Sequence, residues 1–207
     1  MSVVTTIAAS QLSWNHLNDL AHSSTNRRLL TDILHAENAC IAGAPSSRIS
    51  DNRTVAVIVG RAIQNGWDDV LEAAATSRHM TFQDHASILR CGKLFAKEVY
   101  TGILNSPAAA SPAILSMLRN SPYPAVRESV EVKRTAIVIE AIEAARTDPE
   151  AYAVEDGDEH PEVFQAANLA LALGRTDLLS DLVATGCTGA LTAERISMTR
   201  GRQLQAA

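Results

Sequence analysis

The chain has 207 residues, of which 46% are hydrophobic but only 4% aromatic, and its formal net charge at pH 7 is −5. A core of Ala, Leu, Ile and Val favours closely packed helices and argues against a sheet, whose strands are richer in aromatic and β-branched residues. The acidic balance argues against a general nucleic-acid binder, which needs a basic surface to displace the counterions of phosphates, but it leaves a local basic patch open.

Cysteine usage and apolar runs bear on the compartment of the protein. The three cysteines are far apart and include no CxxC pair, which favours reduced thiols over a disulfide or zinc site. The first ten residues lack the basic start and long apolar run of a signal peptide. The most apolar stretch, 135–145, is interrupted by Glu140 and Glu143, so no membrane span is expected. We therefore expect a cytoplasmic protein.

Helical periodicity runs through the first part of the chain, with start and stop signals at short intervals. Ser10 and Asn26 are suited to cap the first two helices, because their side-chain oxygens accept hydrogen bonds from free amides. A loop is expected over 41–50, which is rich in Gly, Pro and Ser. Two further helices are expected at 51–65, ended by Gly66, and at 67–76.

Two capping patterns mark helix starts in the middle of the chain. Thr81 and Asp84 have the spacing of a capping box, although Glu or Gln is usual at the second position. Ser111 before Pro112 combines a capping oxygen with a proline at the first helical position, where its missing N–H costs nothing. Helices are therefore expected over 81–90, over 93–104 and from 112.

The next segment combines a long helix with an acidic stretch. A turn at 121–124 precedes a helix expected over 125–146. Seven acidic residues and no basic one fall between Asp148 and Glu162, which predicts a flexible linker or exposed loop.

Three shorter helices are expected at the C-terminal end, beginning at Pro161, at Thr176 as a cap, and at about residue 191. We therefore divide the chain into a helical domain at 1–147, an acidic loop or linker at 148–162, and a C-terminal helical hairpin with its tail at 163–207. The last segment is expected to pack on the same domain.

One helical hairpin occurs twice in the sequence. Ala62, Gly66, Asp69, Val70 and Leu71 recur 108 residues later as Ala170, Gly174, Asp177, Leu178 and Leu179. Each copy has a helix that ends in glycine, a tight turn, and an acidic residue near the positive end of the next helix dipole. The sequence therefore predicts the same hairpin at two places.

A second repeat has a shorter period. Residues 70–77 match 99–106, and 88–90 match 117–119, both at an offset of 29 residues. A period near this length is typical of helical solenoids, whose units stack on one another.

The segment 103–130 places serines and prolines between apolar positions. The residues concerned are Asn105, Ser106, Pro107, Ser111, Pro112, Leu115, Leu118, Ser121, Pro122, Pro124, Val126, Arg127 and Val130. This pattern resembles one unit of the leucine-rich repeat variant family, which is similar in style to HEAT repeats, although the upstream copy lacks the prolines. The resemblance implies a right-handed stack of short helices with a curved binding or scaffolding surface, and no particular reaction.

These patterns predict an all-α fold of stacked helical hairpins, in the form of a short α-solenoid or HEAT-like superhelix. An irregular helical bundle is the alternative, because Ala-rich hairpins with glycine stops occur in any compact bundle. Both architectures are all-α.

Two clusters of side chains have the chemistry of a catalytic or metal site. His79, Asp84 and His85 are residue types that bind metals or exchange protons, but His79 precedes its helix and Asp84 is the predicted cap, which favours a structural role. The acidic run 155–160 lacks the residue order of an EF-hand loop. With no GxSxG elbow or phosphate-binding loop, the sequence predicts no catalytic residue, no metal ligand and no cofactor.

Arginine and tyrosine, the residues most often found as interface anchors, gather around the turn at 121–124. The candidate binding residues are Arg119, Tyr123, Arg127, Lys133 and Arg134. The alternative is that Arg127 and Lys133 are solvated while Tyr123 covers the end of the core. The tail at 191–203 is also basic, with three arginines and one glutamate.

Three functions are compatible with these features. The favoured one is a non-enzymatic protein–protein interaction module or scaffold that exposes apolar and arginine side chains around 119–134. The second is a HEAT-like protein that binds nucleic acid through the same arginines and the basic tail. The third is a small hydrolase or metalloenzyme at His79, Asp84 and His85. A protein partner is expected, no membrane association is expected, and homo-oligomerisation remains open.

Overall fold

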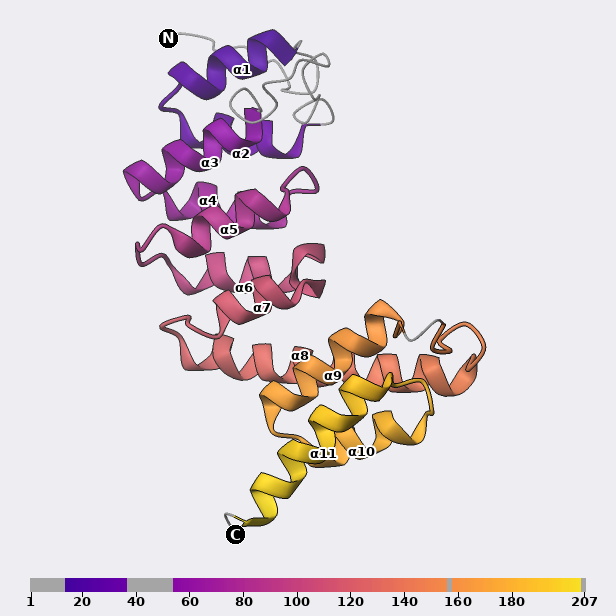
Figure 1. Ribbon diagram of the computed structural model, residues 1–207. Coiled ribbons are helices and arrows are strands. Elements are labelled where there is room, and N and C mark those ends of the chain that lie inside the picture. Colours follow the sequence, from indigo (N-terminus) through magenta and orange to yellow (C-terminus); the bar gives the residue numbers. More distant parts are fainter. Residues whose placement is uncertain (1–13, 37–53, 156–157, 206–207) are drawn as a thin grey trace, which may run out of the picture. The chain divides into compact units, whose positions relative to one another are not determined.

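The computed structural model describes residues 14–36, 54–155 and 158–205 (Figure 1). These ranges hold eleven α-helices, one short 3-10 helix and no strand, and one isolated β-bridge pairs Glu155 with Asp158. The all-α prediction is confirmed. The chain forms two compact units, 1–127 and 128–207, whose boundary falls inside helix α8 (Pro124–Thr147), whereas the division expected from the sequence lies at 147.

The first unit contains short helices. They are α1 (Trp14–Ser23), α2 (Arg27–His35), α3 (Thr54–Asn65), α4 (Asp68–Thr76), α5 (Phe82–Arg90), α6 (Lys97–Asn105), the 3-10 helix η2 (Pro107–Ala110), α7 (Pro112–Leu118) and the first turn of α8. Asn26 Oδ1 accepts a hydrogen bond from Leu29 N at 3.3 Å, as predicted for a cap. Thr81 and Asp84 form the predicted capping box.

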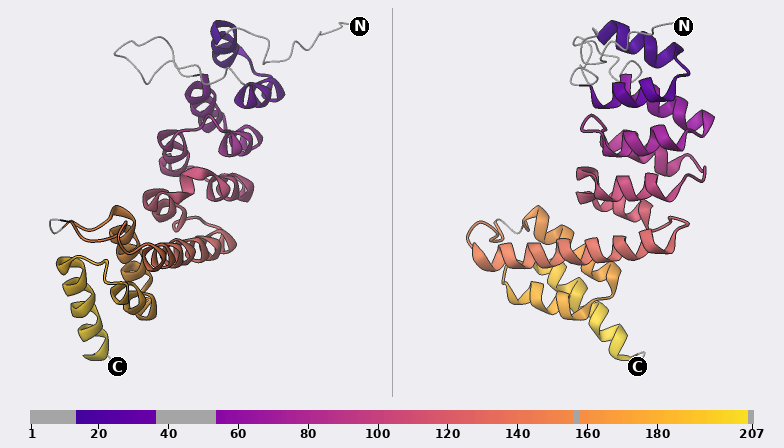
Figure 2. Two further views of the ribbon diagram at one scale, coloured as in Figure 1. Left: turned by 90° about the vertical axis from the view of Figure 1, so that its right-hand side faces the viewer. Right: turned by 180° about the vertical axis from the view of Figure 1, so that it is seen from behind.

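The helices of this unit pack mainly on helices two places away in the chain. Contacts join α1 to α3, α3 to α5 and α5 to α7, and on the other side α2 to α4 and α4 to α6. The left view of Figure 2 shows these helices end-on in two columns. Large apolar side chains fill the space between the columns, and those with no exposed surface include Leu17, Leu30, Ile33, Leu34, Ile58, Leu71, Ile103 and Leu115.

Helices α4 and α6 come closest at Gly102. A Cβ atom added at this residue would lie 2.9 Å from the Cβ of Ala75, which is closer than side chains tolerate. The absence of a side chain at 102 therefore sets the distance between these two helices.

Helix α6 begins four residues later than predicted, at Lys97 rather than Lys93. The ammonium group of Lys93 donates hydrogen bonds to two carbonyls in the last turn of α3, at 2.7 and 2.9 Å. The backbone N–H of Ala96 donates to Asp68 Oδ2 at 3.0 Å. These contacts with earlier helices hold residues 93–96 outside the helix and replace the bonds that helical continuation would give.

Two other predicted caps form no side-chain bond. Helix α7 begins at Pro112 as predicted, but the Ser111 hydroxyl makes no capping hydrogen bond. Thr176 is the first residue of the helix that it was expected to cap, and Arg175 occupies the cap position. The predicted cap Ser10 and the predicted loop at 41–50 lie outside the described residues.

The second unit consists of α8 from residue 128 onward, α9 (Pro161–Leu173), α10 (Thr176–Ala184) and α11 (Ala190–Gln205). One apolar cluster joins these helices, and its members include Val138, Ile142, Val163, Ala167, Leu179, Leu182, Cys187 and Ile196. Cys187 and the half-buried Cys91 are free thiols, whereas Cys40 lies outside the described residues. None of the described helices is long and apolar enough to cross a membrane.

The hairpin predicted at two places is present at both. Gly66 ends α3 with φ +67°, and Gly174 ends α9 with φ +68°. The next residue donates its N–H to the carbonyl of an alanine five residues back, from Trp67 to Ala62 at 3.0 Å and from Arg175 to Ala170 at 3.2 Å. Both turns are therefore Schellman motifs, in which a left-handed glycine lets the chain satisfy the last helical carbonyls.

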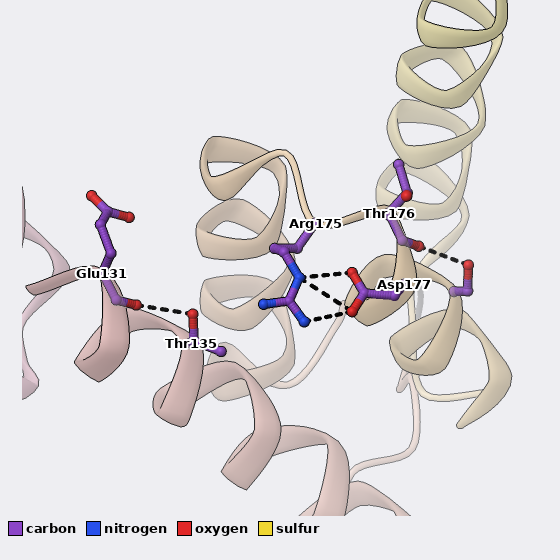
Figure 3. A network of polar contacts seen from close by, with 6 residues as sticks. Glu131, Thr135, Arg175, Thr176 and Asp177 are labelled. Carbon is purple, nitrogen blue, oxygen red and sulfur yellow. Dashed lines mark hydrogen bonds and ion pairs between the residues drawn. The ribbon is translucent and has the colours of Figure 1, made fainter. Parts of the chain in front are cut away.

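The aspartates that follow these glycines bind different arginines. Asp69 pairs with Arg27 of α2, with Oδ1 at 3.2 Å from Nη1. Asp177 pairs with Arg175 of its own turn, and Figure 3 shows the guanidinium pointing at the carboxylate, with Glu131 and Thr135 on α8 nearby. The Arg175 Nε lies 2.8 Å from Asp177 Oδ1, and Nη2 lies 2.5 Å from Oδ2. This bidentate contact lowers the pKa of Asp177 to about 2.

Candidate interaction surface

Tyr123 lies at the start of α8 and is half-buried in the first unit. Its hydroxyl donates a hydrogen bond to the carbonyl of Phe95 at 2.8 Å, and its ring lies 5.6 Å from that of Tyr100. The carbonyl of Tyr123 accepts the amides of Val126 and Arg127. The side chain therefore covers one end of the core, as the structural alternative had it, and only part of it faces solvent.

Arg119 and Arg127 lie on either side of this tyrosine in the sequence, and both are exposed. Arg119 is the C-cap residue of α7. Arg127 donates from Nη1 to the carbonyl of Ser121 at 2.7 Å, which fixes the turn before α8. Each guanidinium keeps exposed surface, so both remain candidates for contact with a partner.

Lys133 and Arg134 belong to the second unit. Arg134 is only 4% exposed, and its Nη1 lies 3.1 Å from Oε2 of Glu131 on the preceding turn of α8. Lys133 is half-buried. The five candidate residues are therefore divided between the two units, and the one with the most buried charge already has a carboxylate partner.

The cluster of His79, Asp84 and His85 has structural contacts. His79 Nε2 lies 2.8 Å from the carbonyl of Ala36, Asp84 caps α5, and His85 Nδ1 lies 2.9 Å from the carbonyl of Thr81. His85 Nε2 is buried and has no hydrogen-bond partner among the described residues. Within ranges 14–36, 54–155 and 158–205, no three His, Cys, Asp or Glu side chains gather closely enough to hold a metal ion.

The acidic segment has no helix in its described residues, and its C-terminal carboxylates bind neighbouring side chains. Glu159 Oε2 accepts a hydrogen bond from the Thr192 hydroxyl of α11 at 2.6 Å. Glu162 Oε2 accepts one from the Tyr152 hydroxyl at 2.9 Å, which raises the pKa of that phenol above its usual value. These bonds attach the end of the segment to α9 and α11.

Helices α2, α4 and α6 have the same length and the same ends. Each is nine residues long and is followed by an extended residue, Ala36, Ser77 or Ser106. The N–H of that residue donates to the carbonyl three residues earlier, at 3.1, 2.9 and 3.1 Å respectively. The 29-residue repeat seen in the sequence relates only α4 to α6. It misses α2 because the offset from α2 to α4 is 41 residues (77 minus 36), which no fixed period detects.

One face of these three helices is polar along its whole length. The second, fifth and ninth residues of each helix are exposed or half-buried, and together we call them the outward face: Arg28, Thr31, His35, Asp69, Glu72, Thr76, Glu98, Thr101 and Asn105. Residues with this spacing share one side of a helix. The charges are unequal, because three carboxylates stand on α4 and α6 and a single arginine stands on α2.

No protein-family model matches this sequence, and no curated protein and no solved structure is significantly similar to it. The resemblance of 103–130 to the leucine-rich repeat variant pattern therefore stays a prediction. The geometry of the first unit carries the functional argument.

Proposed function

We propose that the first unit is a helical-repeat module that binds another protein through the outward face of α2, α4 and α6. The observation that carries this proposal is the shared register of the three helices, which have equal lengths and equal ends. Identical helices that pack on their second neighbours are the arrangement of HEAT-like repeats, whose regular faces serve as extended binding surfaces.

The charges of the outward face favour a partner with basic side chains. Asp69, Glu72 and Glu98 are exposed on α4 and α6. Asp69 already contacts Arg27, which leaves Glu72 and Glu98 as the main acceptors for a cationic partner. Opposite charges across an interface speed association and exclude wrong partners, so we expect binding that weakens as salt rises.

The test is capture of partners from a lysate of the native host by the immobilised full-length chain, with and without nuclease. We expect a stoichiometric protein that survives nuclease and is lost with the double variant Glu72→Lys/Glu98→Lys. The matched control is Asp19→Lys/Glu150→Lys, which changes the net charge equally at exposed carboxylates outside this face. Equal loss with both variants would contradict the proposal. Recovery of nucleic acid alone would favour the phosphate-binding function instead.

A further inference from the structure

The second unit exposes more apolar surface than the first. Among the described residues, the exposed large hydrophobic side chains are Phe82 and Leu94 in the first unit, and Val132, Ile139, Phe164, Val183, Leu191 and Met198 in the second. Four of the latter form two pairs, each on one helix with a spacing of seven residues. Apolar side chains gathered in this way mark contact surfaces.

The first pair lies on α8. Val132 is 66% exposed and Ile139 is 39% exposed, and the exposed Ala136 stands between them on the same side of the helix. This stripe, Val132–Ala136–Ile139, faces away from Val138 and Ile142, which pack in the core. We call it the α8 stripe.

Carboxylates border the α8 stripe. Glu140 and Glu143 are exposed at its C-terminal end, and Glu128 is exposed one turn before Val132. The half-buried Lys133 also lies on this side of the helix, and Arg146 is paired with Asp181 at 3.5 Å. The surroundings of the stripe are therefore predominantly acidic.

The second pair lies on α11. Leu191 is 78% exposed and Met198 is 51% exposed, and they lie on the side of the helix away from the buried Thr192 and Ile196. Arg195 is exposed between them, and we call Leu191–Arg195–Met198 the α11 stripe. Position 202, also an arginine, follows Arg195 by seven residues within the helix, whereas Glu194 is the one acidic residue of this stretch.

The two stripes match in spacing and are opposite in charge. Each offers two apolar side chains seven residues apart, and one is bordered by glutamates while the other contains arginine. The chain's own second unit covers neither of them, because both are exposed within it. Apolar seams with opposite flanking charges are the features by which packed helices choose partners.

We propose that the occupant of each stripe is a second copy of this chain, with the α8 stripe of one molecule packed on the α11 stripe of the other. The contact joins unlike surfaces, so it closes as a dimer when both contacts form reciprocally and extends to further copies when they do not. This association is independent of the outward face of α2, α4 and α6, and leaves that face exposed for a partner.

The experiment is sedimentation equilibrium of the full chain over a range of concentrations, with charge-swapped variants. The mass of the natural chain rises above the 22.1 kDa monomer with concentration. The α8 variant Glu140→Lys/Glu143→Lys and the α11 variant Arg195→Glu/Arg202→Glu each weaken association at least about tenfold, because like charges then oppose each other. The matched control Asp19→Lys/Glu150→Lys associates as the natural chain does.

An equimolar mixture of the two swapped variants decides whether the stripes bind each other. The lysines of one variant then face the glutamates of the other, so association returns to near the natural level, which also shows that both variants are folded. A natural chain that stays monomeric at every concentration overturns the proposal. A mixture as weakly associated as its components overturns it too, and so does an equal loss with the control.

Discussion

Hairpin α3–α4 of the first unit and hairpin α9–α10 of the second share a backbone turn, with φ of +67° at Gly66 and +68° at Gly174. Their aspartates do not share a partner. Asp69 reaches Arg27 on another helix, whereas Asp177 binds Arg175 two residues away. A short sequence pattern thus determines a turn, because its hydrogen bonds are local, but the helices packed nearby determine which group its side chains contact.

The leucines after the two turns provide the test with the largest expected effect. Leu71 and Leu179 occupy equivalent positions in α4 and α10, and neither has exposed surface. Substituting either by alanine removes buried methyl groups and leaves a cavity, so we expect each to destabilise its unit by about 2 to 5 kcal/mol. Hydrogen exchange of the amides in α4 and α10 measures the two effects separately. A loss well under this range in one hairpin would show that the two cores differ.

The glycines of the turns have a smaller expected effect. A Cβ at either residue meets no atom within 4 Å, so alanine at 66 or 174 suffers only from the left-handed backbone, at about 1 to 2 kcal/mol. Gly60 is the matched control, because it lies inside α3 with equally open space and an ordinary φ. Gly60→Ala should stabilise the protein by up to about 1 kcal/mol. Thermal unfolding of the three variants measures these differences, and equal signs would break the comparison.

The acidic residue of the second turn offers the smallest and most local effect. Because Arg175 holds the pKa of Asp177 at about 2, below its usual 3.8, folding favours the ionised carboxylate. This contribution is fully present above the unfolded value of 3.8 and is lost as pH falls through about 2. A carboxyl titration followed by NMR should find this midpoint, and Arg175→Gln should return it toward 3.8. An unchanged midpoint in that variant would rule out the arginine as the cause.

Local chemistry explains which parts of the fold were predictable. The capping box of Thr81 and Asp84 and the two Schellman turns depend on residues within a few positions of one another, and the sequence predicts them correctly. The start of α6 was predicted wrongly because Lys93 and Ala96 are bonded to α3 and α4. Sequence spacing carries no information about such distant acceptors.

The same reasoning applies to the candidate binding residues. Arginine and tyrosine types pointed to the turn at 121–124, but burial depends on the neighbours that the fold supplies. Tyr123 is partly covered because Phe95 and Tyr100 lie beside it, and Arg134 is covered within the second unit. The register of α2 with α4 and α6 went undetected because an irregular connection separates the first copy from the second.

The contact at Gly102 also bears on how this protein can diverge. Ala75 and Gly102 share a space that holds one Cβ, since two would stand 2.9 Å apart. Any relative that keeps α4 and α6 at this distance must therefore carry glycine at one of the two positions, and an alanine acquired at 102 requires a glycine at 75. The pair should drift jointly through the lineage, as a coupled site within otherwise freely varying helices.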